Sequence, residues 1–207
     1  MDHHFACGNC AYFFLDLGHD KEGKIMTLED DFKNTGGGVD LSAIDQMSFA
    51  ELFRRGTELL HQGKALEAIP YLKQAHEEEP QDVDAGVNLA GAYILGKKFK
   101  KAVSVLEPFS EIYPDNPMIW INLGAAYLGN PVLAKDEDQK RAIAAFEHAL
   151  ELHPTAPSVA YNLGLIYRDR QEYDQAVEWF KKAIQHNPRD QHARNILAKL
   201  EAEEESE

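Results

Sequence analysis

At 207 residues the chain can bury a hydrophobic core and has room for one domain with an appendage. Its net charge of −14 and its lack of a basic stripe argue against nucleic acid or an anionic membrane as the main partner. No apolar run approaches the roughly 20 residues that span a bilayer, and Asp2 and two histidines follow Met1 where a secretory signal would be basic and then apolar. We therefore expect a cytoplasmic protein.

Residues 1–30 contain both cysteines of the chain and match nothing else in it. Cys7 and Cys10 have Cys-x-x-Cys spacing, and His3 and His4 lie four and three residues before the first cysteine. These four side chains could ligate zinc, or the cysteine pair could form a redox dithiol. However, a usual zinc finger places its second ligand pair a dozen or more residues away. A plain reduced pair without any cofactor is the alternative.

An apolar segment follows the cysteines. Residues 11–17 and 24–29 have the composition of two strands joined by a Gly-bounded polar turn, which predicts a hairpin. Residues 31–47 then form a flexible linker that contains three consecutive glycines. Because residues 11–17 are too apolar to be left free in water, we hypothesise that they dock on the rest of the chain, in the same molecule or a neighbour.

Four prolines mark an internal repeat in the remainder of the chain. They are spaced by 34, 40 and 34 residues, an alanine lies twelve residues before each of them, and a Leu or Phe lies eight residues before. A Leu-x-x-x-Tyr pattern recurs in the first half of the second, third and fourth units. The prolines are Pro80, Pro114, Pro154 and Pro188, and the alanines are Ala68, Ala102, Ala142 and Ala176.

This pattern resembles the tetratricopeptide repeat family, in which a Trp-Leu-Gly-Tyr helix pairs with an Ala-Phe-Ala-Pro helix. Trp120, Gly124 and Tyr127 carry the first half of that pattern in the third unit. The resemblance covers roughly three-quarters of the chain. It implies an all-α fold, a right-handed solenoid of four helix pairs, that acts as a scaffold for protein–protein interaction. No active-site motif accompanies the repeats, so we expect no catalysis.

The expected units follow directly from the repeat period. The four repeats span residues 48–82, 83–116, 117–156 and 157–190, and a capping helix over 191–201, which Asp190 can cap, precedes an acidic tail over 202–207. The third repeat contains six extra residues, because Tyr127 and Ala142 are 15 residues apart where the second and fourth repeats have 9. Insertions usually fall in loops. We therefore expect these residues between the helices, as a passive elaboration or as a partner contact.

The resemblance also implies a binding surface, since the first helix of each pair lines the concave side in this family. The residue before the Leu of each Leu-x-x-x-Tyr pattern is Asn88, Asn122 or Asn162, and Arg54 takes that place in the first repeat. In one long member of the family, an asparagine ladder at this position holds the backbone of an extended peptide. The apolar neighbours predicted to line the groove include Val87, Ile121, Leu128, Tyr161 and Leu165.

We therefore predict an extended or helical hydrophobic segment as the ligand of the groove. The partner is another protein or the chain's own N-terminal segment. Packing between helices is the alternative role for the same asparagines and apolar residues. Self-assembly into a homo-oligomer through exposed apolar surfaces is a further alternative.

Overall fold

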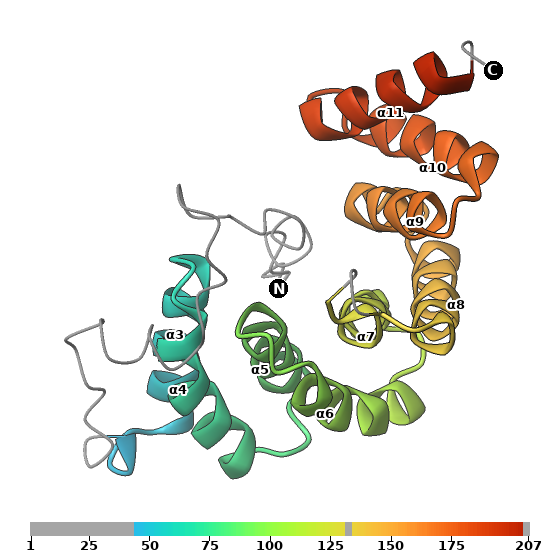
Figure 1. Ribbon diagram of the computed structural model, residues 1–207. Coiled ribbons are helices and arrows are strands. Elements are labelled where there is room, and N and C mark those ends of the chain that lie inside the picture. The colour runs from blue at the N-terminus through green and yellow to red at the C-terminus, as the bar shows by residue number, and fades with distance from the viewer. Residues whose placement is uncertain (1–43, 131–133, 205–207) are drawn as a thin grey trace.

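The computed structural model describes residues 44–130 and 134–204 (Figure 1). Every regular element within these residues is an α-helix, and the helices follow one another as pairs joined by turns. The helices are α3 (Phe49–His61), α4 (Ala65–Glu78), α5 (Val83–Leu95), α6 (Phe99–Ile112), α7 (Pro117–Leu128), α8 (Asp136–Leu152), α9 (Pro157–Asp169), α10 (Tyr173–His186) and α11 (Gln191–Glu204).

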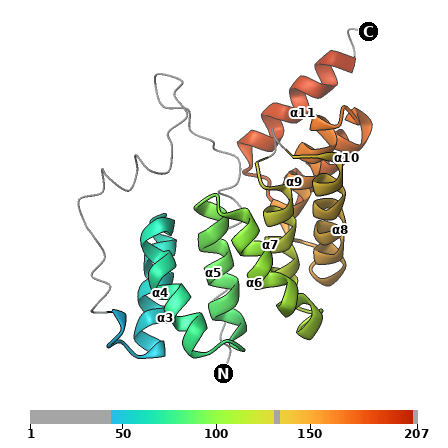
Figure 2. The ribbon, with the colours of Figure 1, turned by 60° about the horizontal axis from the view of Figure 1, so that its bottom comes forward.

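The helix pairs build an arc, as the repeat period predicts. In Figure 1, α5 and α7 lie on the inner side of the arc, and α6 and α8 lie on its outer side. Figure 2 shows the helices of the first three pairs standing side by side in a row. Helix α11 packs on α10 at the end of the row and continues to Glu204, three residues beyond the predicted end of the capping helix. The described chain is thus an α-solenoid.

Three helices that follow an outer helix begin at a polar residue that satisfies a free main-chain amide. Asp82 accepts a hydrogen bond from the amide of Ala85 at 2.7 Å, and Asn116 accepts one from the amide two residues further on at 3.0 Å. Asp190 accepts one from the amide of Ala193 at 2.9 Å, which confirms its predicted role as the cap of the last helix. These caps fix where α5, α7 and α11 start.

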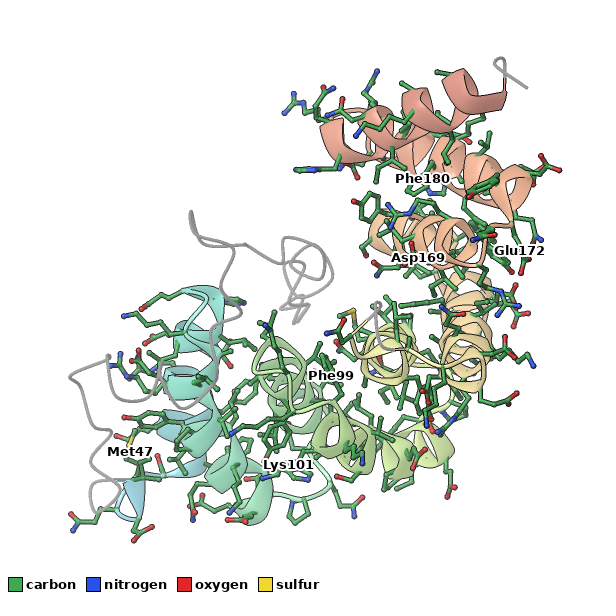
Figure 3. All side chains as sticks on the ribbon, in the orientation of Figure 1. Met47, Phe99, Lys101, Asp169, Glu172 and Phe180 are labelled. Carbon is green, nitrogen blue, oxygen red and sulfur yellow. The ribbon has the colours of Figure 1, made fainter. Side chains whose placement is uncertain are left out.

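Within a pair, a glycine of the inner helix lies against a large side chain of the outer helix. A Cβ atom on Gly124 would lie only 2.6 Å from Cδ1 of Phe146, whose side chain is fully buried. The two helices can therefore approach closely only because this position has no side chain. The same arrangement places Gly56 against Leu72 and Gly164 against Phe180, which Figure 3 labels.

Three of the turns between paired helices share one backbone geometry. One residue in each turn has a positive φ: +75° at Gly63, +56° at Lys97 and +63° at Gln171. The amide of the next residue donates, at 2.7–2.9 Å, to a carbonyl five residues earlier. This is the Schellman arrangement that ends a helix, and it favours glycine at the left-handed position. Only the first of the three turns has glycine there.

The six-residue insertion of the third repeat lies only partly in a loop, contrary to our expectation. Six residues of α8 precede Ala142, whereas three residues precede the equivalent alanine in α4, α6 and α10. Half of the insertion thus extends α8 by nearly one turn. Acidic side chains at Asp136, Glu137 and Asp138 favour a helix N-terminus, and Lys140 pairs with two of them.

The start of the described chain already belongs to the folded array. Ile44 lies within the predicted linker, yet it is only 4% exposed and packs with Leu52 and Ala75. The first repeat therefore gains an apolar contact from residues before its first helix. The predicted hairpin of residues 11–17 and 24–29 lies outside the described residues.

Two apolar clusters meet at the fourth repeat. The larger cluster runs through the first three repeats and into one side of α9, as far as Ile166. The smaller one joins the other side of α9, including Leu165, to α10 and α11. Among consecutive described helices, α8 and α9 share the smallest contact. The junction between the third and fourth repeats is therefore the one with the least direct helix packing.

Candidate functional site

The candidate site consists of three asparagines at equivalent positions on consecutive inner helices. Asn88 lies on α5, Asn122 on α7 and Asn162 on α9. Their side chains are 7%, 4% and 2% exposed, and they are the only buried polar side chains of the described residues. A buried amide without hydrogen bonds costs free energy, so the partners of each asparagine decide what it can do.

The three asparagines differ in their partners. Nδ2 of Asn88 donates a hydrogen bond to Oγ1 of Thr57 on α3, at 3.0 Å. The positions equivalent to Thr57 in the second and third repeats are Gly91 and Ala125, which have no hydroxyl group. Asn122 makes no side-chain hydrogen bond with the described residues, and Oδ1 of Asn162 is buried without a partner. Among the described residues, only the first asparagine thus has a side-chain hydrogen-bond partner, and only the third has a buried amide atom without one.

The sequence motif did not reveal this difference, because all three asparagines occupy the same place in it. Thr57 is the residue that sequence reasoning missed as a partner of Asn88. Aligning the repeats could have found it, since a hydroxyl at that position in one repeat faces the next inner helix.

The apolar residues predicted to line the groove are nearly all in the core. Four of them are at most 8% exposed and belong to the apolar clusters, and the fifth, Tyr161, is half-buried with its ring edge-on to Phe180 and 5.7 Å between the ring centres. The structure therefore gives these side chains a packing role between helices. The four buried residues are Val87, Ile121, Leu128 and Leu165.

Arg54, which takes the place of the asparagine in the first repeat, is paired within its own helix. Its side chain is exposed on α3 and forms an ion pair with Glu58, with 2.6 Å between Nη1 and Oε1. The pair lies one turn apart on the same helix and stabilises that helix locally. The structure therefore does not place a free cation at the end of the asparagine row.

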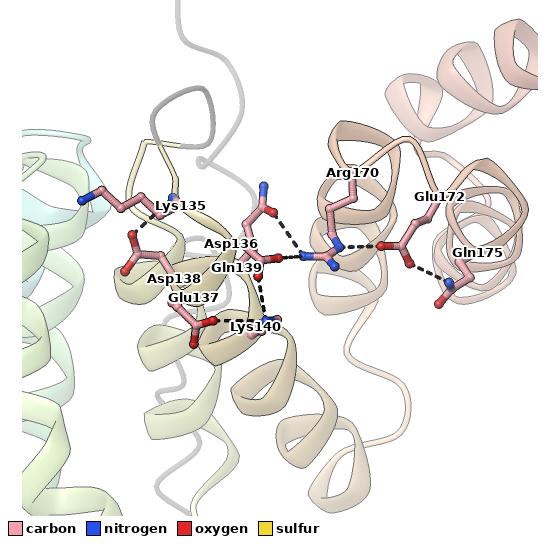
Figure 4. Close-up of polar contacts among 9 residues, drawn as sticks. All are labelled: Lys135, Asp136, Glu137, Asp138, Gln139, Lys140, Arg170, Glu172 and Gln175. Carbon is pink, nitrogen blue, oxygen red and sulfur yellow. Dashed lines mark hydrogen bonds and ion pairs between the residues drawn. The ribbon is translucent and has the colours of Figure 1, made fainter.

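The lengthened start of α8 joins the third repeat to the fourth through a polar network (Figure 4). Arg170 contacts Asp136 through Nη1 and Glu172 through Nε, each at 2.6 Å. Lys140 binds the second oxygen of Asp136 at 2.7 Å. Hydrogen bonds from Lys140 and from Arg170 hold the pKa of Asp136 below its ordinary value. The insertion thus has a structural use, since its extra turn supplies Asp136 to this network.

The candidate zinc ligands Cys7, Cys10, His3 and His4 lie outside the described residues. Within residues 44–130 and 134–204, no group of three or more His, Cys, Asp or Glu side chains is arranged to hold a metal ion. In the same part of the chain, no helix has the length and apolar character needed to cross a membrane.

Two models of the tetratricopeptide repeat family match the sequence, one over residues 59–129 and one over residues 157–190. Together they cover about half of the chain. No curated protein sequence matches it.

Several solved structures have a similar fold. The thermophilic TPR protein TTC0263 of Thermus thermophilus is 23% identical, with a TM-score of 0.64 over 74% of this chain and 81% of that one. A double mutant of MamA RS-1 is 22% identical, with a TM-score of 0.62 over 76% and 86% of the two chains. MamA from residue 41 to its end, from Desulfovibrio magneticus RS-1, is 19% identical, with a TM-score of 0.59 over 90% and 99%. At these identities the likeness establishes the fold.

Proposed function

Because this chain belongs to the tetratricopeptide repeat family, we propose that its concave face binds an extended polypeptide segment through Asn122 and Asn162. Repeat arrays of this family are protein-interaction scaffolds, and this chain is one of them. The observation that supports binding through the two asparagines is that Oδ1 of Asn162 is buried without a hydrogen-bond partner. Asn122, at the equivalent position of the preceding repeat, also makes no side-chain hydrogen bond with the described residues.

An asparagine amide offers one acceptor oxygen and two donor hydrogens, so it can pair with both groups of a peptide unit. Leaving a buried acceptor unpaired costs about 1–3 kcal/mol. A ligand main-chain N–H that reaches Asn162 would remove that penalty, whereas Asn88 already donates to Thr57 and has less to gain. Rotation about χ2, a soft torsion in asparagine, would turn either amide atom toward the ligand.

The ligand class follows from the surroundings of the two amides. Tyr161 is half-buried beside Asn162, and Met118 is half-buried one turn before Asn122, so partly exposed apolar side chains lie next to both buried amides along their helices. A segment with hydrophobic side chains and a free main chain suits both features. Residues 11–17 of this chain, Ala-Tyr-Phe-Phe-Leu-Asp-Leu, have that composition and are the candidate ligand within the molecule.

The test uses a fluorescein-labelled synthetic peptide with the sequence of residues 9–19, followed by anisotropy. The full chain is compared with a Phe13→Ser, Phe14→Ser variant, in which the tethered segment is disabled. We expect tighter binding to the variant, because the intact segment competes at high effective concentration. In the variant background, Asn122→Leu with Asn162→Leu should weaken binding at least roughly tenfold, the loss of about 1.4 kcal/mol.

Asn88→Leu in the same background is the matched control and should leave the affinity nearly unchanged. Equal effects of the three asparagines, or no saturable binding in either background, would contradict the proposal. Stability measurements separate binding from folding. Asn162→Leu removes an unpaired acceptor, so it should leave the free energy of unfolding unchanged or raise it. Asn88→Leu leaves the Thr57 hydroxyl without its hydrogen-bond donor, so it should lower the free energy of unfolding by about 1 kcal/mol.

A further inference from the structure

A cluster of four lysines surrounds the turn between α5 and α6. Lys97 and Lys98 form the end of the turn, and Lys100 and Lys101 lie in the first turn of α6. No carboxylate of the described residues lies within 4.0 Å of any of the four ammonium groups. Lys101 makes only a long cation–π contact, 5.8 Å from the ring centre of Tyr93.

The cluster is distinguished by the closeness of its charges along the chain. Elsewhere in the described residues, Lys73, Lys140 and Lys181 pair with carboxylates, whereas four scattered lysines do not: Lys64, Lys135, Lys182 and Lys199. At the cluster, four like charges fall within five residues, and the first turn of α6 contains no acidic residue. The partial positive charge of the helix N-terminus adds to theirs. All the formal charges within residues 97–101 are therefore of one sign, and none of them is paired with a carboxylate of the described residues.

The base of the cluster is held in place. The amide of Lys98 donates to the carbonyl of Tyr93 at 2.7 Å, which closes the turn. Phe99, between the two lysine pairs, is half-buried and packs against the main apolar cluster, close to Gly129 of the next repeat. Figure 3 labels Phe99 and Lys101 where α5 meets α6. A ligand would therefore bind four side chains on an ordered backbone, which lowers the entropy lost on binding.

We propose that the lysine cluster is a docking site for an acidic segment of a partner protein. Charge complementarity selects an acidic ligand. The net charge of −14 opposes a long polyanion such as nucleic acid, which would extend over the acidic remainder of the surface. A short run of Asp or Glu contacts only the cluster. The site lies at a turn and on α6, away from Asn122 and Asn162, so it does not depend on the function proposed for them.

The test measures the affinity of fluorescein-labelled decaglutamate for the full chain, at about 50 mM and about 200 mM salt. The test variant changes all four lysines to Gln, a residue that Gln171 shows to fit the left-handed position of the equivalent turn. The control variant makes the same net-charge change elsewhere, with Lys64, Lys181, Lys182 and Lys199 changed to Gln. Circular dichroism checks that both variants are folded.

We expect the cluster variant to bind decaglutamate roughly tenfold more weakly than the full chain, and the higher salt to weaken binding to the full chain. The control variant should lose much less. Equal losses in the two variants, or no loss in either, would overturn the proposal. Tighter binding of an oligothymidylate of equal charge would also overturn it, in favour of nucleic acid. So would decaglutamate binding that appears only after Glu29→Gln, Asp30→Asn and Asp31→Asn, since the chain's own acids would then occupy the cluster.

Discussion

Gly124→Ala tests how closely the two helices of the third repeat are packed. The added methyl group would lie 2.6 Å from two ring carbons of Phe146, a fully buried side chain. Overpacking of a closed core destabilises by about 1–3 kcal/mol, and the better helix propensity of Ala offsets about 0.5–1 kcal/mol of this. We therefore expect the free energy of unfolding to fall by about 1–2 kcal/mol.

The second repeat shows how the clash can be relieved. It has Ala90 where the third repeat has Gly124, and it has the smaller Leu106 where the third repeat has Phe146. Phe146→Leu alone should cost about 1–2 kcal/mol through lost apolar contact and a residual cavity. The double variant recreates the pair of the second repeat, so it should cost little more than Phe146→Leu alone. This predicts a favourable coupling of about 1–2 kcal/mol.

Urea unfolding, followed by far-ultraviolet circular dichroism and by tryptophan fluorescence, measures the coupling. Trp120 lies on the same helix as Gly124, and Trp179 on α10 adds a signal from the fourth repeat. Repeat arrays can unfold in more than one step, so the two signals must give coincident transitions and an unchanged m-value before free energies are compared. Additivity of the two single changes within about 0.5 kcal/mol would refute the packing argument.

Two further predictions concern the turns and the pH dependence of stability. Gln171→Gly removes the steric strain of a side chain at a positive φ and should raise the free energy of unfolding by about 0.5–1 kcal/mol. Gly63→Ala makes the opposite change at the equivalent turn and should lower the free energy of unfolding by about 1 kcal/mol. Burial lowers the pKa of His76, so the unfolded chain binds more protons than the folded one below about pH 6.5, and stability should fall as the pH falls through that range. His76→Leu should flatten this part of the urea-midpoint curve, and an unchanged slope would contradict the assignment.

The repeat period predicted the helix pairs even where local propensity opposes them. Pro70 and Pro108 lie inside α4 and α6, where a proline removes a main-chain hydrogen bond and usually ends a helix. The buried alanine and leucine positions of those helices still follow the period, and their packing outweighs the local cost. By contrast, the period located the insertion but did not show that half of it would be helical. The acids at 136–138 followed by Lys140 were the available signal.

The candidate site was less predictable than the fold. All residues of α5 from 85 to 94 are buried, and nearly all of them are apolar or glycine. The sequence of this helix therefore does not distinguish residues that line a groove from residues that pack between helices. The asparagines could be located from the Leu-x-x-x-Tyr pattern, but their hydrogen bonds depend on which residue of the preceding repeat faces them. Thr57 therefore separates Asn88 from the other two, and nothing within one repeat shows this.

The polar network at the start of α8 has a mechanical consequence. In a solenoid each repeat touches only its neighbours, so the bending stiffness of the whole is set by its weakest joint. Direct helix packing is smallest between α8 and α9, and the partly exposed ion pair of Arg170 with Asp136 bridges that joint. Exposed ion pairs are screened by salt, whereas apolar packing is not. The curvature of the described arc should therefore relax first between its third and fourth repeats as the ionic strength rises.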